Sequence, residues 1–150
     1  MREGYFAAYA GAYDRVQSVR IEMYDFYHEL ALDFVPFELT DELRILELGF
    51  GTGTFLGSIL RRYPRATAVA LDYAPEMLEI ARSKMGENAH RVQFRQQNLN
   101  AGLPGDVSEL DFAASFSAIH HLTDDNKRRL CSQVHDRLSP GGWFFLIDAM

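Results

Sequence analysis

The sequence predicts an α/β domain, a doubly wound parallel sheet of about five strands with helices on both faces. Two observations predict this fold. Short apolar runs alternate along the chain with stretches of helical periodicity, and the runs are too continuously apolar to have one face in water. The length of 150 residues, with 47% apolar composition, suits one domain of this kind. In such sheets, ligands bind beyond the carboxyl ends of the strands.

Residues 1–43 are predicted to form a helical segment that packs on a domain formed by residues 44–150. Between Asp14 and Val35, apolar residues recur at steps of three and four, the period of an amphipathic helix, and Pro36 ends the pattern. Several tyrosines lie in or just before this helix, an aromatic density beyond what simple packing requires. The segment fits either a lid over a site or packing at the rim of the core.

The rest of the chain alternates strands and helices. The expected strands cover residues 44–48, 66–71, 91–95, 110–117 and 143–147. Helices are expected at 54–63, at 75–85, where Pro75 suits the first turn and Gly86 the stop, and after Thr123 or Asp124. The sequence Ser-Pro-Gly-Gly at 139–142 predicts a turn before the last strand.

Charge and composition narrow the functional classes. The chain has 15 Lys and Arg against 21 Asp and Glu, a net charge of −6, so no diffuse positive field would gather nucleic acid or anionic lipid. Cys131 is the only cysteine, so no internal disulfide can form, and no Cys or His spacing indicates a metal site. The first residues resemble neither a signal peptide nor a membrane span, which favours a cytoplasmic protein.

The segment Glu47-Leu48-Gly49-Phe50-Gly51-Thr52-Gly53 joins the first expected strand to the next helix. Its glycines remove three side chains from the turn, so backbone N–H groups and the helix N-terminus can approach a ligand closely. Glu47 precedes the first glycine by two positions, and Asp72 ends the next strand. A carboxylate at that place suits a ribose diol, because it accepts both hydroxyl hydrogens. The pattern predicts a nucleoside-cofactor site.

These motifs resemble those of the class I S-adenosylmethionine-dependent methyltransferases, which have a Rossmann-like fold. The first motif of that family, acidic-x-Gly-x-Gly-x-Gly, is similar to residues 47–53. Residues 71–78 resemble the second motif, and residues 138–142 resemble the turn before the fifth strand. The resemblance spans Arg44 to Asp148. It implies methyl transfer from S-adenosyl-L-methionine (SAM), with S-adenosyl-L-homocysteine (SAH) as the product.

The resemblance also implies which residues hold the cofactor. Asp72 would bind the ribose hydroxyls, and Glu47 would orient the methionine part. The other implied residues are Gly49, Phe50, Gly51 and Gly53 in the turn, Tyr73 and Met77 beside the adenine, and Asn98 and Leu99 at its edge. Many family members have Asp where this chain has Asn98, so the amide keeps hydrogen bonds but not the charge. Tyr73 and Met77 fit simple packing beside the sheet equally well.

The segment after the fourth expected strand borders the methionine part and the acceptor pocket in the resembling family. Ser117 and Ala118 are the cofactor candidates in this segment. His120 and His121 are candidates for a catalytic base or for a group that orients the acceptor. Adjacent side chains point in different directions, so at most one of the two histidines would face the site. A capping or packed histidine is the alternative for each.

Both ends of the chain bear on this pocket. In the N-terminal helix, Tyr24 or Tyr27 would shelter the sulfonium through a cation–π contact and exclude water. At the other end, family members continue past the fifth strand with a helix and an antiparallel strand pair, which this chain lacks. Residues 143–147 would then form an exposed apolar edge. We therefore expect a truncated chain, or an edge covered by a partner such as a second copy in a homo-oligomer.

Three other functions fit parts of the pattern. A nicotinamide-dependent dehydrogenase also has a glycine turn after a strand, but its third glycine position is Thr54 here, and Glu47 would face a pyrophosphate. A catalytically silent binding or scaffold module would keep the fold without turnover. A tRNA-modifying enzyme would need a basic stripe that the sequence lacks. The leading hypothesis is a methyltransferase that acts on a small-molecule acceptor.

Overall fold

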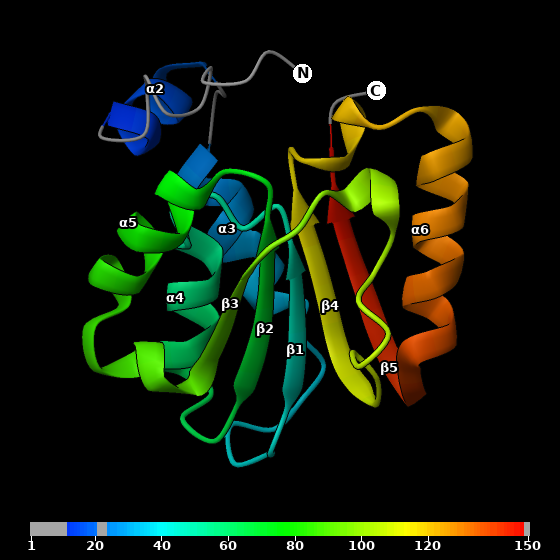
Figure 1. Ribbon diagram of the computed structural model, residues 1–150. Coiled ribbons are helices and arrows are strands. Elements are labelled where there is room, and N and C mark those ends of the chain that lie inside the picture. Colours follow the sequence, from blue (N-terminus) through cyan, green and yellow to red (C-terminus); the bar gives the residue numbers. More distant parts are fainter. Residues whose placement is uncertain (1–11, 21–23, 149–150) are drawn as a thin grey trace.

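The structure, a computed structural model, describes residues 12–20 and 24–148, without the side chains of residues 17–20, 24 and 25. Its centre is a five-stranded sheet in the order β3-β2-β1-β4-β5, and every neighbouring pair of strands is parallel (Figure 1). The strands are β1 (Arg44–Leu48), β2 (Thr67–Asp72), β3 (Val92–Gln96), β4 (Leu110–Phe116) and β5 (Leu138–Ile147). The α-helices are α2 (Tyr13–Arg20), α3 (Tyr24–Asp33), α4 (Thr54–Arg62), α5 (Pro75–Met85) and α6 (Asp124–Arg137).

The direction in which the strands follow one another reverses beside β1. From β1 the chain moves outward through α4 to β2 and through α5 to β3. It then returns across the sheet to β4, on the other side of β1, and continues through α6 to β5. A doubly wound sheet binds its ligand where this reversal occurs, at the carboxyl ends of the strands. The topology therefore directs attention to the ends of β1, β2 and β4.

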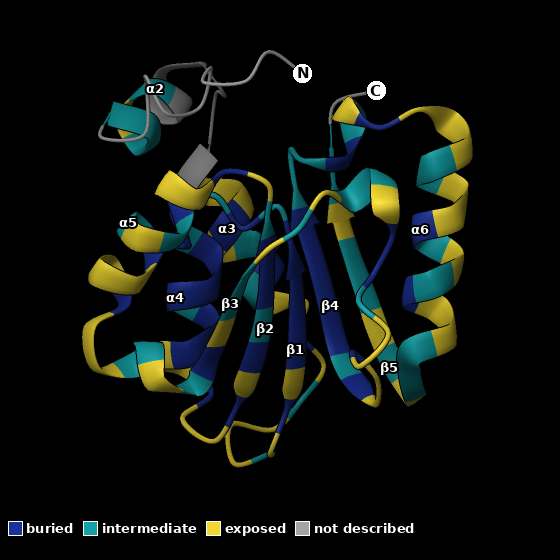
Figure 2. Ribbon diagram, in the orientation of Figure 1, coloured by how far each residue is buried: buried dark blue, intermediate teal, exposed yellow. Residues whose placement is uncertain are grey.

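Side chains on the strands alternate between two apolar cores, one on each face of the sheet. Ile45 belongs to the core that includes residues of α3, α4 and α5, whereas Leu46 belongs to the core that includes residues of α6. Both side chains are fully buried, at 1% and 0% exposure. Figure 2 shows the result: the central strands and the inner side of α4 are buried, and the outer sides of the helices are exposed. Two covered faces explain why Ile45, Leu46 and Leu48 of β1 are apolar although they point to both sides of the sheet.

The predicted fold class and several predicted element ends are confirmed. The sheet has five parallel strands with helices on both faces. Pro75 begins α5, and Gly86 follows its last residue with a φ of +53°. Thr123 caps α6, because its hydroxyl oxygen accepts a hydrogen bond from the backbone N–H of Asn126 at 3.4 Å. Local sequence signals were sufficient at these positions.

Two predicted elements were wrong in their extent. The single helix predicted from Asp14 to Val35 is described as two helices, α2 and α3, with residues 21–23 outside the described part. An apolar period cannot distinguish one helix from two that follow each other. The turn predicted at 139–142 lies inside β5 as a bulge, because Leu138 pairs with Leu110 and Trp143 pairs with Phe112.

β5 forms one edge of the described sheet and is only partly covered. Its apolar sequence predicted burial on both faces, yet Trp143 is 51% exposed and Leu146 is 43% exposed. β5 is more exposed than its sequence predicted because, among the described strands, only β4 pairs with it, so its other edge is uncovered. The exposed apolar edge that the sequence analysis expected is therefore present among the described residues.

Candidate functional site

The turn between β1 and α4 holds three glycines in backbone conformations that other residues rarely adopt. Gly49, Gly51 and Gly53 have φ angles of +69°, +55° and +75°. A Cβ atom on Gly49 would lie 2.3 Å from the Cβ atom of Ala118, so only glycine allows this close approach. The N–H of Gly49 donates to the carbonyl oxygen of Leu71 at 2.7 Å. The turn therefore fits tightly between the carboxyl ends of β2 and β4.

Asp72 is the last residue of β2, and its carboxylate is bonded to two backbone groups. Oδ2 accepts from the N–H of Gly51 at 2.9 Å, and Oδ1 accepts from the N–H of Ala74 at 2.9 Å. Burial raises the pKa of Asp72, and these N–H groups act in the opposite direction. A carboxylate has more lone pairs than these bonds use, so Asp72 can hold the turn and still accept the hydroxyl hydrogens of a ribose.

Glu47 is a buried carboxyl group inside β1, with an exposure of only 3%. Among the described residues, no group forms a hydrogen bond with its Oε2 atom. Burial and then the negative charge of Asp72 raise the pKa of Glu47 well above its usual value of 4.5, while the backbone N–H of Leu56 lowers it. A buried oxygen without a partner costs free energy, and such a group beside a glycine turn indicates a ligand that donates hydrogen bonds.

These groups fit the parts of SAM. The ammonium of its methionine part is a cation with N–H donors, which Oε2 of Glu47 lacks in the protein itself. Its ribose offers two hydroxyl donors to Asp72, which lies one strand away from Glu47. The glycine turn connects the two carboxylates, because it follows Glu47 in the chain and its Gly51 N–H donates to Asp72. The donor and acceptor chemistry of the site is therefore complementary to the cofactor.

The other residues expected in the turn and beside the adenine have different environments. Phe50 is 4% exposed, and its ring lies 5.7 Å from that of Phe94, so its backbone rather than its side chain belongs to the turn. Met77 is 1% exposed and packs with Ala74 in a small apolar cluster. Tyr73 is 37% exposed at the end of β2. Tyr73 is thus the more accessible of the two residues expected at the adenine.

Asn98 and Leu99 lie just after β3, where the sequence analysis placed the edge of the adenine. The side-chain oxygen of Asn98 accepts from the backbone N–H of Asn100 at 3.0 Å and caps the short turn η3 (Leu99–Ala101). Leu99 packs against the core on the α6 side of the sheet. The amide NH2 group of Asn98 is the part of that side chain that remains for a ligand.

The segment that follows β4 contacts both β5 and the glycine turn after β1. Ser117 has a φ of +49°, and its N–H donates to the carbonyl oxygen of Ile147 at 2.8 Å. Ala118 follows, and its Cβ atom occupies the space that a side chain at Gly49 would need. The structure thus brings Ser117 and Ala118 beside the glycine turn, as the sequence analysis expected.

His120 and His121 lie in the short turn η4 (Ile119–His121) and have different partners. Nδ1 of His120 bonds Oδ1 of Asp148, and the backbone N–H of His120 donates to Oδ2 of Asp148 at 2.9 Å. The Asp148 side chain is 7% exposed and that of His120 is 31% exposed. Burial, followed by the charge of His120, lowers the pKa of His121. His120 is therefore the histidine that a buried carboxylate orients.

The tyrosines expected to shelter the sulfonium lie in α3. Tyr27 is 38% exposed, and its ring meets that of Phe26 edge-on, with centroids 6.0 Å apart. The side chain of Tyr24 lies outside the described part of the structure. The role predicted for Tyr24 or Tyr27 stays a prediction, and among the described side chains the ring of Tyr13, in α2, lies beside the glycine turn. A Cβ atom on Gly51 would lie 3.4 Å from Cε1 of Tyr13.

The sequence analysis missed two residues at this end of the sheet, Tyr13 and Asp148. Tyr13 lies far from Gly51 in the sequence, and no local pattern indicates that they meet. Asp148 follows β5 directly, and the rule that found Asp72, an acid where a parallel strand ends, would also have found it.

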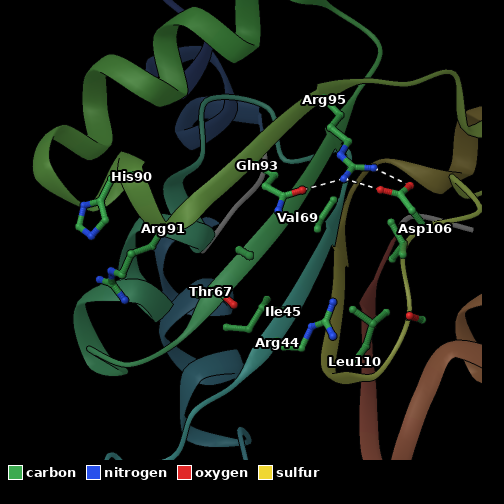
Figure 3. Close-up of a pocket in the computed structure, with 13 residues that line it drawn as sticks. Arg44, Ile45, Thr67, Val69, His90, Arg91, Gln93, Arg95, Asp106 and Leu110 are labelled. Carbon is green, nitrogen blue, oxygen red and sulfur yellow. Dashed lines mark hydrogen bonds and ion pairs between the residues drawn. The ribbon is translucent and has the colours of Figure 1, made fainter.

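A cavity of about 300 Å³ lies elsewhere, at the amino ends of β1 and β2 (Figure 3). Its cationic side chains are already engaged by other groups of the protein. Arg44 bonds Glu109 at 2.8 Å, and Arg95 bonds Asp106 at 2.8 Å. Arg91 donates to three backbone carbonyl oxygens, including that of Leu60 at 2.7 Å. None of the predicted site residues lines this cavity.

Two further observations hold for the described residues only. No helix among them has the length and apolar character needed to cross a membrane. No group of three or more His, Cys, Asp or Glu side chains among them has an arrangement that could hold a metal ion.

Comparisons with known proteins identify the family to which the chain belongs. Residues 45–142 match a family model described as a methyltransferase domain. The chain is 27% identical over 141 residues to a release factor glutamine methyltransferase of Koribacter versatilis, covering 79% of this chain and 50% of the relative. It is 30% identical over 138 residues to malonyl-[acyl-carrier protein] O-methyltransferase 1 of Ilyobacter polytropus, covering 91% and 47%. The chain thus spans about half the length of these curated relatives.

Solved structures show the same fold. The DhpI–SAH complex superposes with a TM-score of 0.72 at 25% identity and covers 94% of this chain and 64% of that one. A methyltransferase in complex with the Trm112 activator of Haloferax volcanii gives a TM-score of 0.75 at 25% identity, with coverage of 97% and 60%. The fold and its cofactor class therefore agree with the site described above.

Proposed function

Because this chain belongs to the methyltransferase domain family, whose cofactor is SAM, we propose that it binds SAM at the carboxyl ends of β1 and β2 and transfers the methyl group to a small-molecule acceptor. The chain spans about half the length of its curated relatives, so turnover by this chain is part of the proposal and does not follow from the family alone.

One observation carries the proposal: the buried Oε2 atom of Glu47, which has no partner among the described residues and lies beside the glycine turn. A structural role alone would not keep a carboxyl group there, because burial disfavours its ionised form. A bound ammonium group would restore the lost interactions and favour ionisation. Asp72 then fixes the ribose, so that two carboxylates orient the two ends of the cofactor.

Bound SAM would supply an electrophilic methyl group on a sulfonium, and the sulfur would keep the electron pair of the broken bond. What the protein adds is position: holding donor and acceptor in line can lower the barrier by about 7 kcal/mol in favourable cases. Glu47 and Asp72 position the methyl donor. The segment from Ser117 to His121 lies beside the turn and provides groups that position the acceptor.

We further propose that His120 receives the proton of the acceptor. Its Nδ1 atom faces the buried carboxylate of Asp148, so that Nδ1 carries the proton and Nε2 holds a free lone pair. When the acceptor O–H or N–H group attacks the methyl carbon, its proton moves to Nε2. An acceptor that is already an anion, such as a carboxylate, needs no such base. The dyad therefore favours a hydroxyl or amine acceptor.

A small acceptor is favoured over a nucleic acid by charge, since a net charge of −6 would repel the phosphate backbone of a tRNA. The relatives named above act on a release factor glutamine and on malonyl-[acyl-carrier protein], as their names state. The alternative from another class is a silent module that binds SAM without turnover. Turnover, rather than binding, distinguishes the two.

Calorimetry with SAM tests the binding proposal, and we expect one site per chain with a rise in melting temperature. At SAM concentrations about 100 times Kd, the stabilisation should reach about 2.7 kcal/mol. Absence of heat and of any melting shift at saturating SAM would contradict the proposal.

Turnover is then tested with methyl-labelled SAM and a metabolite extract, comparing the unaltered protein with His120→Gln and Asp148→Asn. Loss of a general base lowers the rate by about 100- to 10,000-fold. Binding without label transfer to any metabolite would favour the silent module.

A further inference from the structure

A single carboxylate, that of Asp14, bonds α2 to the glycine turn. Its Oδ1 atom accepts hydrogen bonds from the hydroxyl groups of Thr52 and Thr54, the latter at 3.3 Å. Its Oδ2 atom accepts from Nζ of Lys84 at 2.5 Å. Lys84 also donates to the hydroxyl oxygen of Thr54 at 2.8 Å, which closes the cluster. We refer to these four residues as the Asp14 cluster.

The Asp14 cluster connects three elements that the cofactor site requires. Thr52 lies between Gly51 and Gly53 in the turn, Thr54 begins α4, and Lys84 lies in the last turn of α5. None of these residues is near Asp14 in the sequence. The cluster is therefore a tertiary connection from α2 to the frame that holds the two carboxylates of the site.

The cluster combines a buried hydroxyl group with an exposed ion pair. Thr52 is 3% exposed, whereas the side chains of Lys84 and Asp14 are 40% and 44% exposed. Burial of Asp14 acts against ionisation, but the bonds from Lys84 and Thr52 outweigh it and lower the pKa of Asp14. Asp14 is therefore ionised at neutral pH, and water and salt can reach its pair with Lys84.

Tyr13, the residue next to Asp14, covers the site. Its ring lies beside Gly51, and it packs against Ala74 and Met77, which follow Asp72 in the sequence. Figure 1 shows α2 beyond the carboxyl ends of the strands, above α5. The position of the ring over the cofactor turn thus depends on the bonds made by its neighbour.

We propose that Asp14 is a positioning residue for cofactor binding, and that the Asp14 cluster is a latch that holds α2 and Tyr13 over the glycine turn. The inference rests on the proposed function, since the latch covers the same site. Exposed ion pairs change equilibria by about two- to fivefold. A latch of this strength slows the exchange of cofactor and product without blocking it.

The rate at which SAH dissociates from its complex tests the latch, and stopped-flow displacement measures this rate. We expect Asp14→Ala to raise the SAH dissociation rate about fivefold and Lys84→Met to raise it about twofold. Added salt should speed release from the unaltered protein, because it screens the ion pair, and should have little effect on Asp14→Ala. The exchanged pair, Asp14→Lys with Lys84→Asp, should restore slow release.

Lys127→Met is the matched control, because Lys127 forms an exposed ion pair with Asp124 at 3.4 Å in α6, on the other face of the sheet. Equal acceleration in this control, or unchanged SAH release from Asp14→Ala, would overturn the latch and leave the proposed function intact. If the unaltered protein bound no SAH, the proposed function and the latch would both be wrong. Melting temperatures of all variants separate faster release from loss of folding.

Discussion

The glycine turn and the cavity at the opposite end of the sheet both contain charged groups, but these groups find their partners in different ways. At the turn, Oε2 of Glu47 is buried without a partner among the described residues, and three glycines have positive φ. In the cavity, Arg44 and Arg95 are paired with acids, and Arg91 is bonded to backbone carbonyls. The turn has one buried carboxyl oxygen without a partner among the described residues, and the cavity has open volume whose arginines are already bonded.

Open volume and polar groups without partners are often taken together as signs of a binding site, but in this protein they occur in different regions. Open volume shows only where the packing of helices on the sheet is incomplete. A buried polar group without a partner costs free energy in the isolated protein, so it requires another explanation, and a ligand supplies it. We therefore place the proposed functional region at the turn and not at the cavity. The following predictions test this contrast, beginning with the largest effect.

Gly49→Ala should have the largest effect on stability. A side chain at a φ of +69° costs about 1–3 kcal/mol, and its Cβ atom would lie 2.3 Å from that of Ala118, so β1 or β4 must shift. Urea denaturation should show a loss beyond the strain alone. Gly57→Ala in α4 is the control, because the nearest atom lies 3.4 Å away in the flexible Arg61 side chain and alanine favours helix by about 1 kcal/mol. Equal losses in both variants would contradict the close packing of the turn.

Glu47→Gln should weaken SAM binding while it stabilises the protein without cofactor. Loss of a charged hydrogen bond costs about 1.5–3 kcal/mol, which is an increase in Kd of roughly 10- to 150-fold. The raised pKa of Glu47 means that the folded state keeps its proton to higher pH than the unfolded chain. The contribution of Glu47 to the free energy of unfolding is therefore fully present below its usual pKa of 4.5, and it is lost as the pH rises through the raised pKa of the folded state.

The measurements for Glu47→Gln are melting temperature and calorimetry across that pH range. Without cofactor, the fall in melting temperature above pH 4.5 should be smaller in the variant than in the unaltered protein. SAM affinity should rise with pH in the unaltered protein only, because the ionised carboxylate is the form that holds an ammonium group. A variant with unchanged affinity would show that Glu47 does not contact the cofactor.

Arg95→Gln, in the cavity, should have the smallest effect. Its pair with Asp106 has side-chain exposures of 29% and 65%, and water screens an ion pair this exposed, so it contributes little to stability. We expect a small loss of stability in urea and an unchanged Kd for SAM. A tenfold weakening of SAM binding would mean that the cavity is coupled to the turn and would remove the contrast between the two regions.

Much of the fold and of the site could be predicted from the sequence because the signals are local. The glycine turn, Glu47 and Asp72 lie at strand ends that the apolar runs define, and parallel strands bring their carboxyl ends to one edge of the sheet. Pro75, Gly86 and Thr123 mark helix ends through their own backbone and side-chain chemistry. These predictions need no knowledge of distant contacts.

The rest could be decided only by the tertiary structure. The apolar period could not show that the N-terminal segment forms the two helices α2 and α3, nor that Tyr13 of α2 lies beside Gly51. The choice between His120 and His121 depends on Asp148, at the end of another strand. The sequence by itself determined where the strands end and which polar side chains lie there, because strand ends are a local property. Contacts between residues of separate helices and strands depend on how those elements pack against each other. No local sequence pattern specifies that packing.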